Sequence, residues 1–298
     1  MPKVSVITCT FNRAHLIGET IQHVLDQSFQ DFEYIIVDDG STDDTASVVN
    51  SFADLRIHFH QHARTFGHLS ALRNFAHSKS GGEYFAYVDS DDLWEKDKLE
   101  IQVTALEKDN QIGFSFTDIT IFKDNIILKK SIYNKTGFFI GSVFDQMLKN
   151  KLIICHTTLL IRKSCMELLG SMDESMHSGD HDLVFVLSRM FKAYVIYAPL
   201  VQVRKHNQNS TGSHSLSLIL LKEHHHTIHK LYFKNLITKR EFKTAMANTS
   251  YDFALQLIFT KDYKSVKLYL LKCLRIQPWR WKAVAHWIII SAKQITGI

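Results

Sequence analysis

Two acidic motifs in the first hundred residues stand directly after short apolar runs. The pair 38–39 (Asp-Asp) follows the run 34–37, and the segment 89–92 (Asp-Ser-Asp-Asp) follows the run 84–88. Carboxylates placed this close together repel one another unless water or a cation neutralises them. Mg²⁺ and similar ions are commonly held by one or two carboxylates together with phosphate oxygens of a substrate. The motifs therefore indicate a site for a phosphorylated ligand and a divalent cation.

Each motif also has a structural interpretation. The acids at 89–92 could lie in a solvated turn in which Asp92 caps the next helix. After the first pair, Gly40 is typical of a turn, and Ser41 or Thr42 is expected to cap a helix. A capped turn does not explain two acids in front of it. An ionised Asp only accepts hydrogen bonds, so it suits the imide N–H of uracil or a ribose hydroxyl.

The elements that must position these acids are strands of a mostly parallel sheet. Four apolar runs are read as strands, at 4–8, 34–37, 56–59 and 84–88. They alternate with segments of helical spacing such as 16–25, which implies right-handed crossovers. Because polar groups that follow parallel strands collect at one edge of the sheet, the tips at 10–12, 38–41 and 89–92 are expected to meet there.

The regular alternation ends near Asn110, and the chain changes character again towards its C-terminus. Residues 113–132 are read as strands, and helical spacing returns in three segments, at 216–236, 238–259 and 263–276. With 298 residues, 45% hydrophobic and 22% charged, the chain can bury a sizeable core, which excludes a disordered or fibrous protein. We expect an α/β domain over 1–212 and a helical, basic extension over 213–298.

Four segments taken together resemble the family 2 glycosyltransferases with the GT-A fold. They are 4–13 (VSVITCTFNR), 37–43 (VDDGSTD), 71–74 (ALRN) and 89–92 (DSDD). Their order and spacing match over about the first 115 residues and more loosely to about 212. The resemblance implies a Rossmann-like, three-layer α/β/α mixed sheet. It further implies a nucleotide-binding half (1–115) and an acceptor-binding half (116–212).

The resemblance also implies a donor site with a metal. Asp91 would hold Mn²⁺ or Mg²⁺, and Asp89 would bind the ribose or complete the metal shell. Asp39 would contact the nucleotide base. The residues expected to bind the nucleotide sugar are Thr10, Asn12, Arg13, Asp39, Arg73, Asp89, Ser90 and His206. Arg73, with Asn74, would face the nucleotide pocket, although Arg73 could equally lie on a helix surface and pair with Asp38 or Asp39.

A third acidic motif precedes an apolar helix further along the chain. Asp180 matches the family's catalytic base, which takes the proton from the acceptor hydroxyl, although Gly179 replaces the usual Glu. Asp180 could instead be only the N-cap of the helix, where the free N–H groups stabilise a carboxylate. Both roles can hold together. Asp182 is expected to be an acid of the first helical turn.

Two further segments, one at the acceptor side and one near the end of the catalytic domain, are similar to places in the family. The segment 155–158 (Cys-His-Thr-Thr) sits where acceptor-facing residues often lie. Arg204-x-His206 resembles the family's Arg-x-His motif, in which the His donates to a diphosphate or helps to hold the metal. The alternative for His206 is a loop histidine with no task.

The expected activity is therefore that of an inverting hexosyltransferase. It would move a sugar from a nucleotide-diphosphate donor, UDP by resemblance, to a hydroxyl of a glycan or lipid-linked acceptor in cell-surface polysaccharide biosynthesis. A nucleotidyltransferase would need a Gly-rich, Lys-bearing loop near the N-terminus, and 8–13 contains no glycine. A nucleic-acid-binding module would need neither Asp91 nor Asp180, so we expect no nucleic-acid partner.

The basic charge of the chain is concentrated at its C-terminus. Residues 256–298 contain eight Lys or Arg and one acid, Asp262, interleaved with aromatic residues such as Trp279 and Trp281. This pattern fits peripheral contact with an anionic membrane, and packing against the catalytic domain or a second subunit would explain it too. Four separated cysteines and the lack of a signal peptide predict a cytoplasmic protein, on the inner face of the membrane if the tail binds there.

Overall fold

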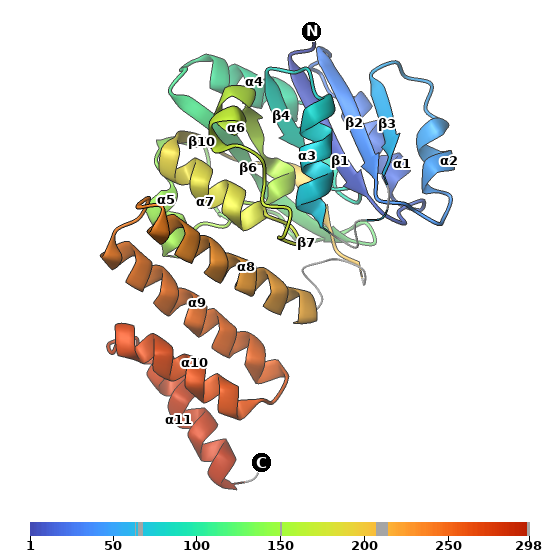
Figure 1. Cartoon of the computed structure of the whole chain (residues 1–298). Helices are drawn as coiled ribbons and strands as arrows, with labels where there is room; N and C mark the ends of the chain where they lie inside the picture. The colour runs from blue at the N-terminus through green and yellow to red at the C-terminus, as the bar shows by residue number, and fades with distance from the viewer. Residues whose placement is uncertain (63, 65–67, 150, 207–213, 297–298) are drawn as a thin grey trace. The chain divides into compact units, whose positions relative to one another are not determined.

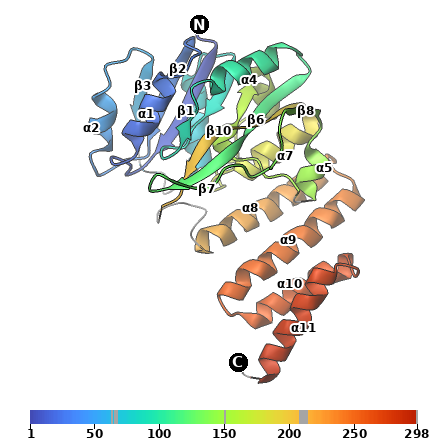
Figure 2. The ribbon, with the colours of Figure 1, turned by 180° about the vertical axis from the view of Figure 1, so that it is seen from behind.

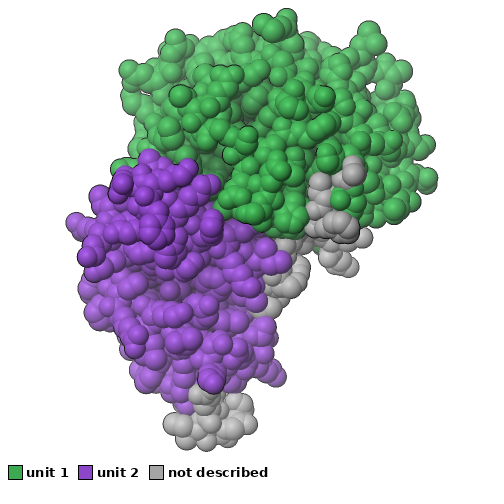
Figure 3. All heavy atoms as spheres, viewed as in Figure 1, with its two compact units in different colours: residues 1–143, 154–206 green, residues 144–153, 207–298 purple. Residues whose placement is uncertain are grey.

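The chain forms two compact units, which Figure 3 distinguishes by colour. The first contains residues 1–143 and 154–206, and the second contains 144–153 and 207–298. The structure is a computed structural model (Figure 1), and it describes residues 1–62, 64, 68–149, 151–206 and 214–296. The expected domain boundary between 212 and 213 lies outside the described residues.

The first unit is built on one mixed sheet, which has ten strands in the described residues. Its main order is β3-β2-β1-β4-β9-β6-β10-β5. The first four strands of that order are mutually parallel, and β9 runs antiparallel to both β4 and β6. The strands are β1 (Val4–Thr10), β2 (Phe32–Asp38), β3 (Ile57–Gln61), β4 (Tyr84–Tyr87), β5 (Leu93–Trp94), β6 (Ile112–Lys123), β7 (Ile126–Lys129), β8 (Phe138–Gly141), β9 (Leu160–Arg162) and β10 (Lys192–Arg204). All the predicted strands are present.

Helices cover both faces of this sheet, as the opposite views of Figures 1 and 2 show. One face carries α1 (Ile17–Leu25), α2 (Thr45–Asn50) and α4 (Lys98–Glu107). The other carries α3 (Leu69–Lys79), α6 (Lys163–Leu169) and α7 (Asp180–Met190). The three-layer α/β/α arrangement expected from the sequence is therefore confirmed.

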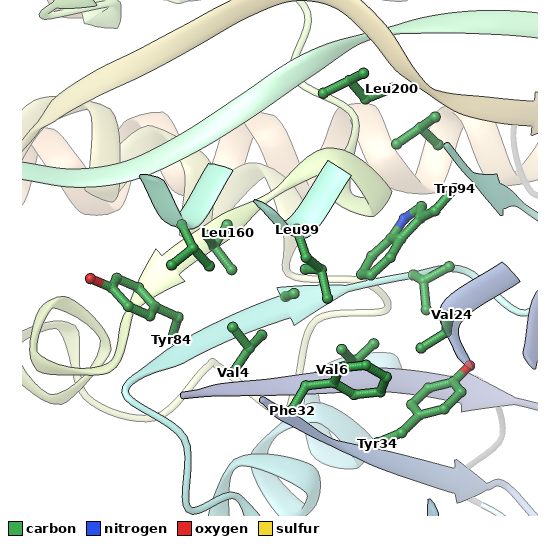
Figure 4. Packing of buried hydrophobic residues seen from close by; sticks show 14 of the residues in the cluster. Val4, Val6, Val24, Phe32, Tyr34, Tyr84, Trp94, Leu99, Leu160 and Leu200 are labelled. Atoms are coloured by element: carbon green, nitrogen blue, oxygen red, sulfur yellow. The ribbon is translucent and has the colours of Figure 1, made fainter. Parts of the chain in front are cut away.

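A hydrophobic core lies between the sheet and the helices α1, α2 and α4, and it includes residues of β4, the strand that precedes the acidic motif 89–92. Val4 and Val6 of β1, with Tyr34 of β2, pack together in this layer (Figure 4). Trp94, 1% exposed, lies in the same cluster, and its indole N–H donates to the carbonyl oxygen of Thr157 (3.1 Å). That hydrogen bond holds the segment 155–158 beside the acidic motif.

The second unit is helical. It contains α5 (Phe144–Leu148), α8 (His214–Phe233), α9 (Lys239–Phe259), α10 (Tyr263–Ile276) and α11 (Trp281–Thr296). The three predicted helical segments are thus confirmed. A capping box starts α9: Thr238 Oγ1 accepts from the N–H of Glu241 (3.2 Å), and the Glu241 carboxylate accepts from the N–H of Thr238 (2.6 Å). Asn248 Nδ2 donates to the Leu148 carbonyl (2.8 Å), which joins α5 to this unit.

A lysine lies inside the core of the first unit. Lys98 on α4 is fully buried, its ammonium stands 3.8 Å from the centre of the Trp94 ring, and it donates to Gln102 Oε1 (2.6 Å). No carboxylate within the described residues forms a salt bridge with it. Burial therefore lowers the pKa of Lys98 well below its ordinary value of 10.5.

The lowered pKa of Lys98 predicts a pH-dependent stability. Between the folded and unfolded pKa values the unfolded chain binds more protons, so the free energy of unfolding rises with pH up to about 10.5. Lys98→Met removes this dependence. Between about pH 7 and pH 9.5 we expect the free energy of unfolding of the wild type to rise by about 1 kcal/mol or more above the change seen in Lys98→Met. Urea unfolding at each pH measures both values. The exposed Lys96→Met is the control, and parallel curves for wild type and Lys98→Met would contradict the expectation.

Candidate active site

The pair of acids after β2 consists of two carboxylates with different surroundings. The Asp38 carboxylate is buried and accepts from both the hydroxyl and the backbone N–H of Ser41 (3.1 Å for the latter). The expected helix cap at Ser41 or Thr42 is therefore wrong: Ser41 closes a turn on Asp38, and α2 begins only at Thr45. The turn is fixed before the helix starts, because a short Asp side chain reaches its own backbone a few residues later.

Asp39 lies beside a cation that the sequence did not single out. The Asp39 side chain is 2% exposed and forms an ion pair with Arg64. The Arg64 guanidinium lies 3.4 Å from the centre of the Phe11 ring, on the loop after β1. A carboxylate, a guanidinium and an aromatic ring thus stand together at the position expected to receive the nucleotide base. Nothing local in the sequence linked Arg64 to this group.

The loop after β1 is tied to the turn after β2. Asn12 has φ of +49°, and its Oδ1 accepts from the backbone N–H of Thr42 (2.8 Å). The N–H of Arg13 donates to Thr45 Oγ1 (2.8 Å). Thr10 is buried, and its Oγ1 has no hydrogen-bond partner within the described residues. The predicted residues Thr10, Asn12 and Arg13 therefore share one edge of the sheet with Asp39.

The acids after β4 meet a histidine from the far end of the first unit. His206 Nε2 lies 2.7 Å from Asp91 Oδ2, and both side chains are largely covered, with 19% and 14% exposed. His206 therefore contacts the predicted metal ligand directly, as a role in holding the metal would require. Ser90, between the two predicted ligands, is also buried.

Asp92 has a structural task different from the cap considered above. It is 3% exposed and accepts from the backbone N–H of Arg204 (3.1 Å), while Arg204 Nε donates to the carbonyl of Asp91 (3.1 Å). The following helix, α4, starts at Lys98 and has Asp97 at its N-cap position. The cap at Asp92 is therefore wrong: Asp92 ties the motif to the end of β10.

Asp89 shows that the acidic groups and Asp180 form one electrostatic site. The Asp89 side chain is exposed, but desolvation by the protein atoms around its carboxyl group, then the negative charge of Asp91, shifts its pKa upward, while the Arg73 charge opposes the rise. The charge of Asp180 contributes as well. The groups predicted at the end of β4 and at the start of α7 are thus close enough to act on one another. Carboxylates crowded in this way favour a bound cation.

Arg73 on α3 binds the predicted base. Its side chain is 4% exposed, forms an ion pair with Asp180 Oδ1, and donates to the carbonyl of Ser178 (2.6 Å). The alternative in which Arg73 lies on the surface and pairs with Asp38 or Asp39 is therefore wrong. The next residue, Asn74, holds the turn at 172–174: its Nδ2 donates to the Met172 carbonyl and its Oδ1 accepts from the Met172 N–H, each at 2.9 Å.

Comparison with known proteins decides what kind of site this is. The model of the family "Glycosyl transferase family 2" matches residues 5–169, more than half of the chain. The chain belongs to this family. It is a glycosyltransferase, as the sequence predicted.

This family 2 glycosyltransferase has similar relatives among bacterial proteins. It is 36% identical over 199 residues to the putative teichuronic acid biosynthesis glycosyltransferase TuaG of Bacillus subtilis. The matched residues make up 66% of this chain and 75% of TuaG. It is 30% identical over 246 residues to the UDP-Glc:alpha-D-GlcNAc-diphosphoundecaprenol beta-1,3-glucosyltransferase WfaP of Escherichia coli. The matched residues make up 78% of this chain and 93% of WfaP.

A solved structure shows the fold. The structure of Staphylococcus aureus TarS in complex with UDP-GlcNAc superposes with a TM-score of 0.61 at 18% identity. The superposition covers 99% of this chain and 92% of the TarS chain. At this level of identity the likeness establishes the GT-A fold and nothing finer.

The glycosyltransferase differs from the usual family motif at Gly179, and packing explains why. Gly179 has φ of +67°, and a Cβ atom added there would lie 2.8 Å from Ser70 Oγ and 3.0 Å from Met172 Cε. A Glu at this position would be strained by the positive φ and would have to displace the side chains of Ser70 and Met172. Gly179 is also the N-cap of α7, so Asp180 is the first helical residue and the N-cap alternative for Asp180 is wrong.

The described residues contain no group of three or more His, Cys, Asp or Glu side chains arranged to hold a metal ion. Asp91 and His206 offer a carboxylate and an imidazole at one point, with Asp89 nearby. Such a donor set suits a divalent ion that takes its remaining ligands from phosphate oxygens. The residues present therefore fit a substrate-completed metal site better than a permanent one.

Proposed function

We propose that this glycosyltransferase is an inverting hexosyltransferase with a UDP-sugar donor, a divalent cation and Asp180 as its base. The observation that carries the proposal is the position of two separate groups on one sheet edge. One is the Asp91–His206 pair, and the other is Asp180 held by Arg73. The first suits a leaving diphosphate, and the second suits the hydroxyl that attacks.

The donor end of the site accounts for nucleotide binding. Asp39, beside Arg64 and Phe11, offers an acceptor for the imide N–H of uracil. Asp91, Asp89 and His206 would hold Mn²⁺ or Mg²⁺, since carboxylate and phosphate oxygens suit both ions. A bound cation supplies positive charge where the diphosphate becomes more negative as it leaves. The name of WfaP, which includes UDP-Glc, supports UDP as the nucleotide.

The reaction requires one displacement and no covalent enzyme intermediate. The acceptor hydroxyl oxygen bonds to the anomeric carbon as the bond from that carbon to the diphosphate oxygen breaks. The hydroxyl proton passes to the Asp180 carboxylate, and the nucleoside diphosphate leaves with the bonding electrons. Attack from the side opposite the leaving group inverts the anomeric configuration. Arg73 keeps Asp180 in place because its guanidinium is buried and anchored on Ser178.

A panel of sugar nucleotides tests the proposal. Release of UDP from UDP-glucose, UDP-N-acetylglucosamine and UDP-galactose is measured with and without Mn²⁺, with GDP-mannose and dTDP-glucose as competing donors. We expect turnover with at least one UDP-sugar that requires the cation, and an increase in thermal stability with UDP and Mn²⁺ together. If no sugar nucleotide is turned over or stabilises the protein, the proposal is wrong.

We also propose that the acceptor is a lipid-linked glycan used for surface polysaccharide and that the second unit contacts the inner face of the membrane. The name of WfaP describes a diphosphoundecaprenol-linked acceptor, and that of TuaG describes teichuronic acid biosynthesis. None of the described helices is long and apolar enough to cross a bilayer. Contact would therefore be peripheral.

The exposed side of α10 and α11 supports this contact. On α10 the exposed residues recur at helical spacing and combine leucine with basic side chains: Lys264, Leu268, Leu271, Lys272 and Arg275. Trp279, in the segment before α11, and Trp281, its first residue, are 77% and 71% exposed. Tryptophan and basic residues together are typical of helices that lie in the interface of an anionic membrane.

Vesicle binding tests the membrane contact. We expect the full chain to sediment with phosphatidylglycerol vesicles and not with phosphatidylcholine vesicles, and added salt to weaken the binding. The double variant Trp279→Ala/Trp281→Ala should lose it, whereas Leu55→Ala, which removes a 98% exposed leucine of the first unit, should not. A dimer that dissociates in the double variant, with no vesicle binding by the wild type, would assign this surface to a second subunit.

A further inference from the structure

His156 lies behind the predicted base and is not explained by the reaction described so far. It opens a single 3-10 turn (His156–Thr158) and is 7% exposed. Its ring centre lies 4.2 Å from that of Tyr87, and the Tyr87 hydroxyl is 2.8 Å from His77 Nε2. The ring is therefore held on one side by a hydrogen-bonded aromatic pair at the end of β4.

The neighbours of His156 determine which ring nitrogen carries the proton. Arg73 Nη2 lies 3.3 Å from His156 Nδ1, and a guanidinium can only donate hydrogen bonds. Nδ1 must therefore accept, which places the proton on Nε2. Burial, with the charges of Arg73 and His77, lowers the pKa of His156 well below 6.5, so the ring stays neutral at physiological pH.

The Nε2–H group points at the base without yet bonding to it. Nε2 is buried and has no hydrogen-bond partner within the described residues. Asp180 Oδ1, the oxygen that Arg73 also contacts, lies 3.8 Å from it. Buried donors without an acceptor are rare in native proteins, so this one needs an explanation. Hydrogen bonds around catalytic groups are often long without substrate and shorten in the reacting complex.

We propose that His156 is a positioning residue for Asp180. Its Nε2–H closes onto Oδ1 when substrates bind, so that Arg73 and His156 together fix the rotation of the carboxylate and hold it ionised. A second donor on the same oxygen restricts the rotation of the carboxylate further than the Arg73 contact does. The inference rests on the proposed role of Asp180 as the base. His156 acts through Asp180 and accepts no proton itself.

Two substitutions separate the two nitrogens of the ring. His156→Asn keeps a polar atom near Nδ1 for Arg73 and removes the Nε2 donor, whereas His156→Gln can place an amide N–H near Nε2. We expect kcat to fall roughly 10-fold in His156→Asn and to recover partly in His156→Gln, with unchanged binding of UDP. The acidic limb of the pH–rate profile should move to higher pH in His156→Asn, because the ionised carboxylate loses a donor. A wild-type rate and pH profile in His156→Asn would overturn the proposal.

Nuclear magnetic resonance of ¹⁵N-histidine tests the same inference without turnover. We expect His156, assigned by its loss in His156→Asn or His156→Gln, to be the Nε2–H tautomer, with its Nε2 signal moving in Asp180→Asn and not in Asp182→Asn. A proton on Nδ1, or an Nε2 signal indifferent to the loss in Asp180→Asn of the carboxylate charge 3.8 Å away, would refute the inference. Because the spectra need no substrate, a failure of the proposed transferase activity would remain distinguishable from a failure of this inference.

Discussion

Asp180→Asn should reduce kcat by roughly 1,000-fold while leaving UDP binding unchanged. Asparagine has nearly the shape of aspartate and can still accept a hydrogen bond from Arg73, but it cannot take the proton of the acceptor hydroxyl. The loss should therefore appear in turnover and not in the binding of the donor. Steady-state rates of UDP release and calorimetric titration with UDP and Mn²⁺ measure the two quantities separately.

Asp182→Asn is the matched control for Asp180→Asn. It removes a carboxylate from the same first turn of α7, so it changes the charge at the start of this helix in the same way. We expect turnover close to that of the wild type. If Asp180→Asn retains wild-type turnover, or if both variants lose it equally, then Asp180 is not the base.

Asp91→Asn should abolish the effect of Mn²⁺ on UDP binding and lower turnover by roughly 100-fold or more. Its carboxylate lies 2.7 Å from His206 Nε2, and the variant removes the negative charge from that pair. In the wild type, Mn²⁺ should tighten UDP binding, because Asp91 and His206 would hold the cation, which would supply positive charge to the diphosphate. Calorimetric titration of UDP with and without Mn²⁺ gives the comparison directly.

The control for Asp91→Asn is Asp97→Asn, which changes an exposed acid at the start of α4. It should retain both the Mn²⁺ effect and the turnover. Strengthening of UDP binding by Mn²⁺ to the same extent in Asp91→Asn and in the wild type would show that this carboxylate does not hold the cation.

The parts of the fold that the sequence predicted well depend on local patterns. Apolar runs followed by polar residues located β1, β2 and β4, and helical spacing located α8, α9 and α10. The cap at Ser41 was mispredicted because the Ser41 hydroxyl donates to Asp38 in a local turn, and the helix begins only at Thr45. The grouping of 144–153 with the second unit could not be predicted, because it depends on hydrogen bonding between residues far apart, such as Asn248 and the Leu148 carbonyl.

The sequence predicted individual residues of the candidate site but not the contacts between them. The motifs located Asp91, His206 and Asp180, but the contact between Arg73 and Asp180 joins residues more than a hundred positions apart. No periodicity or spacing connects them, so Arg73 was expected on the nucleotide or on the surface. His156 was noticed only as part of an acceptor-facing segment. Its contact with Arg73 depends on how the turn before β9 packs against β4 and α3.

A single displacement at the anomeric carbon with Asp180 as the base must invert the anomeric configuration of the sugar. The anomer that is first released therefore tests this mechanism. Enzyme at high concentration is mixed with UDP-α-glucose, or with the α-linked donor that the panel identifies, in the presence of Mn²⁺. Proton NMR then records the first sugar released to water or to an acceptor. We expect the β-anomer from the wild type and almost no release from Asp180→Asn. Initial release of the α-anomer, or release by Asp180→Asn at the wild-type rate, would contradict this mechanism.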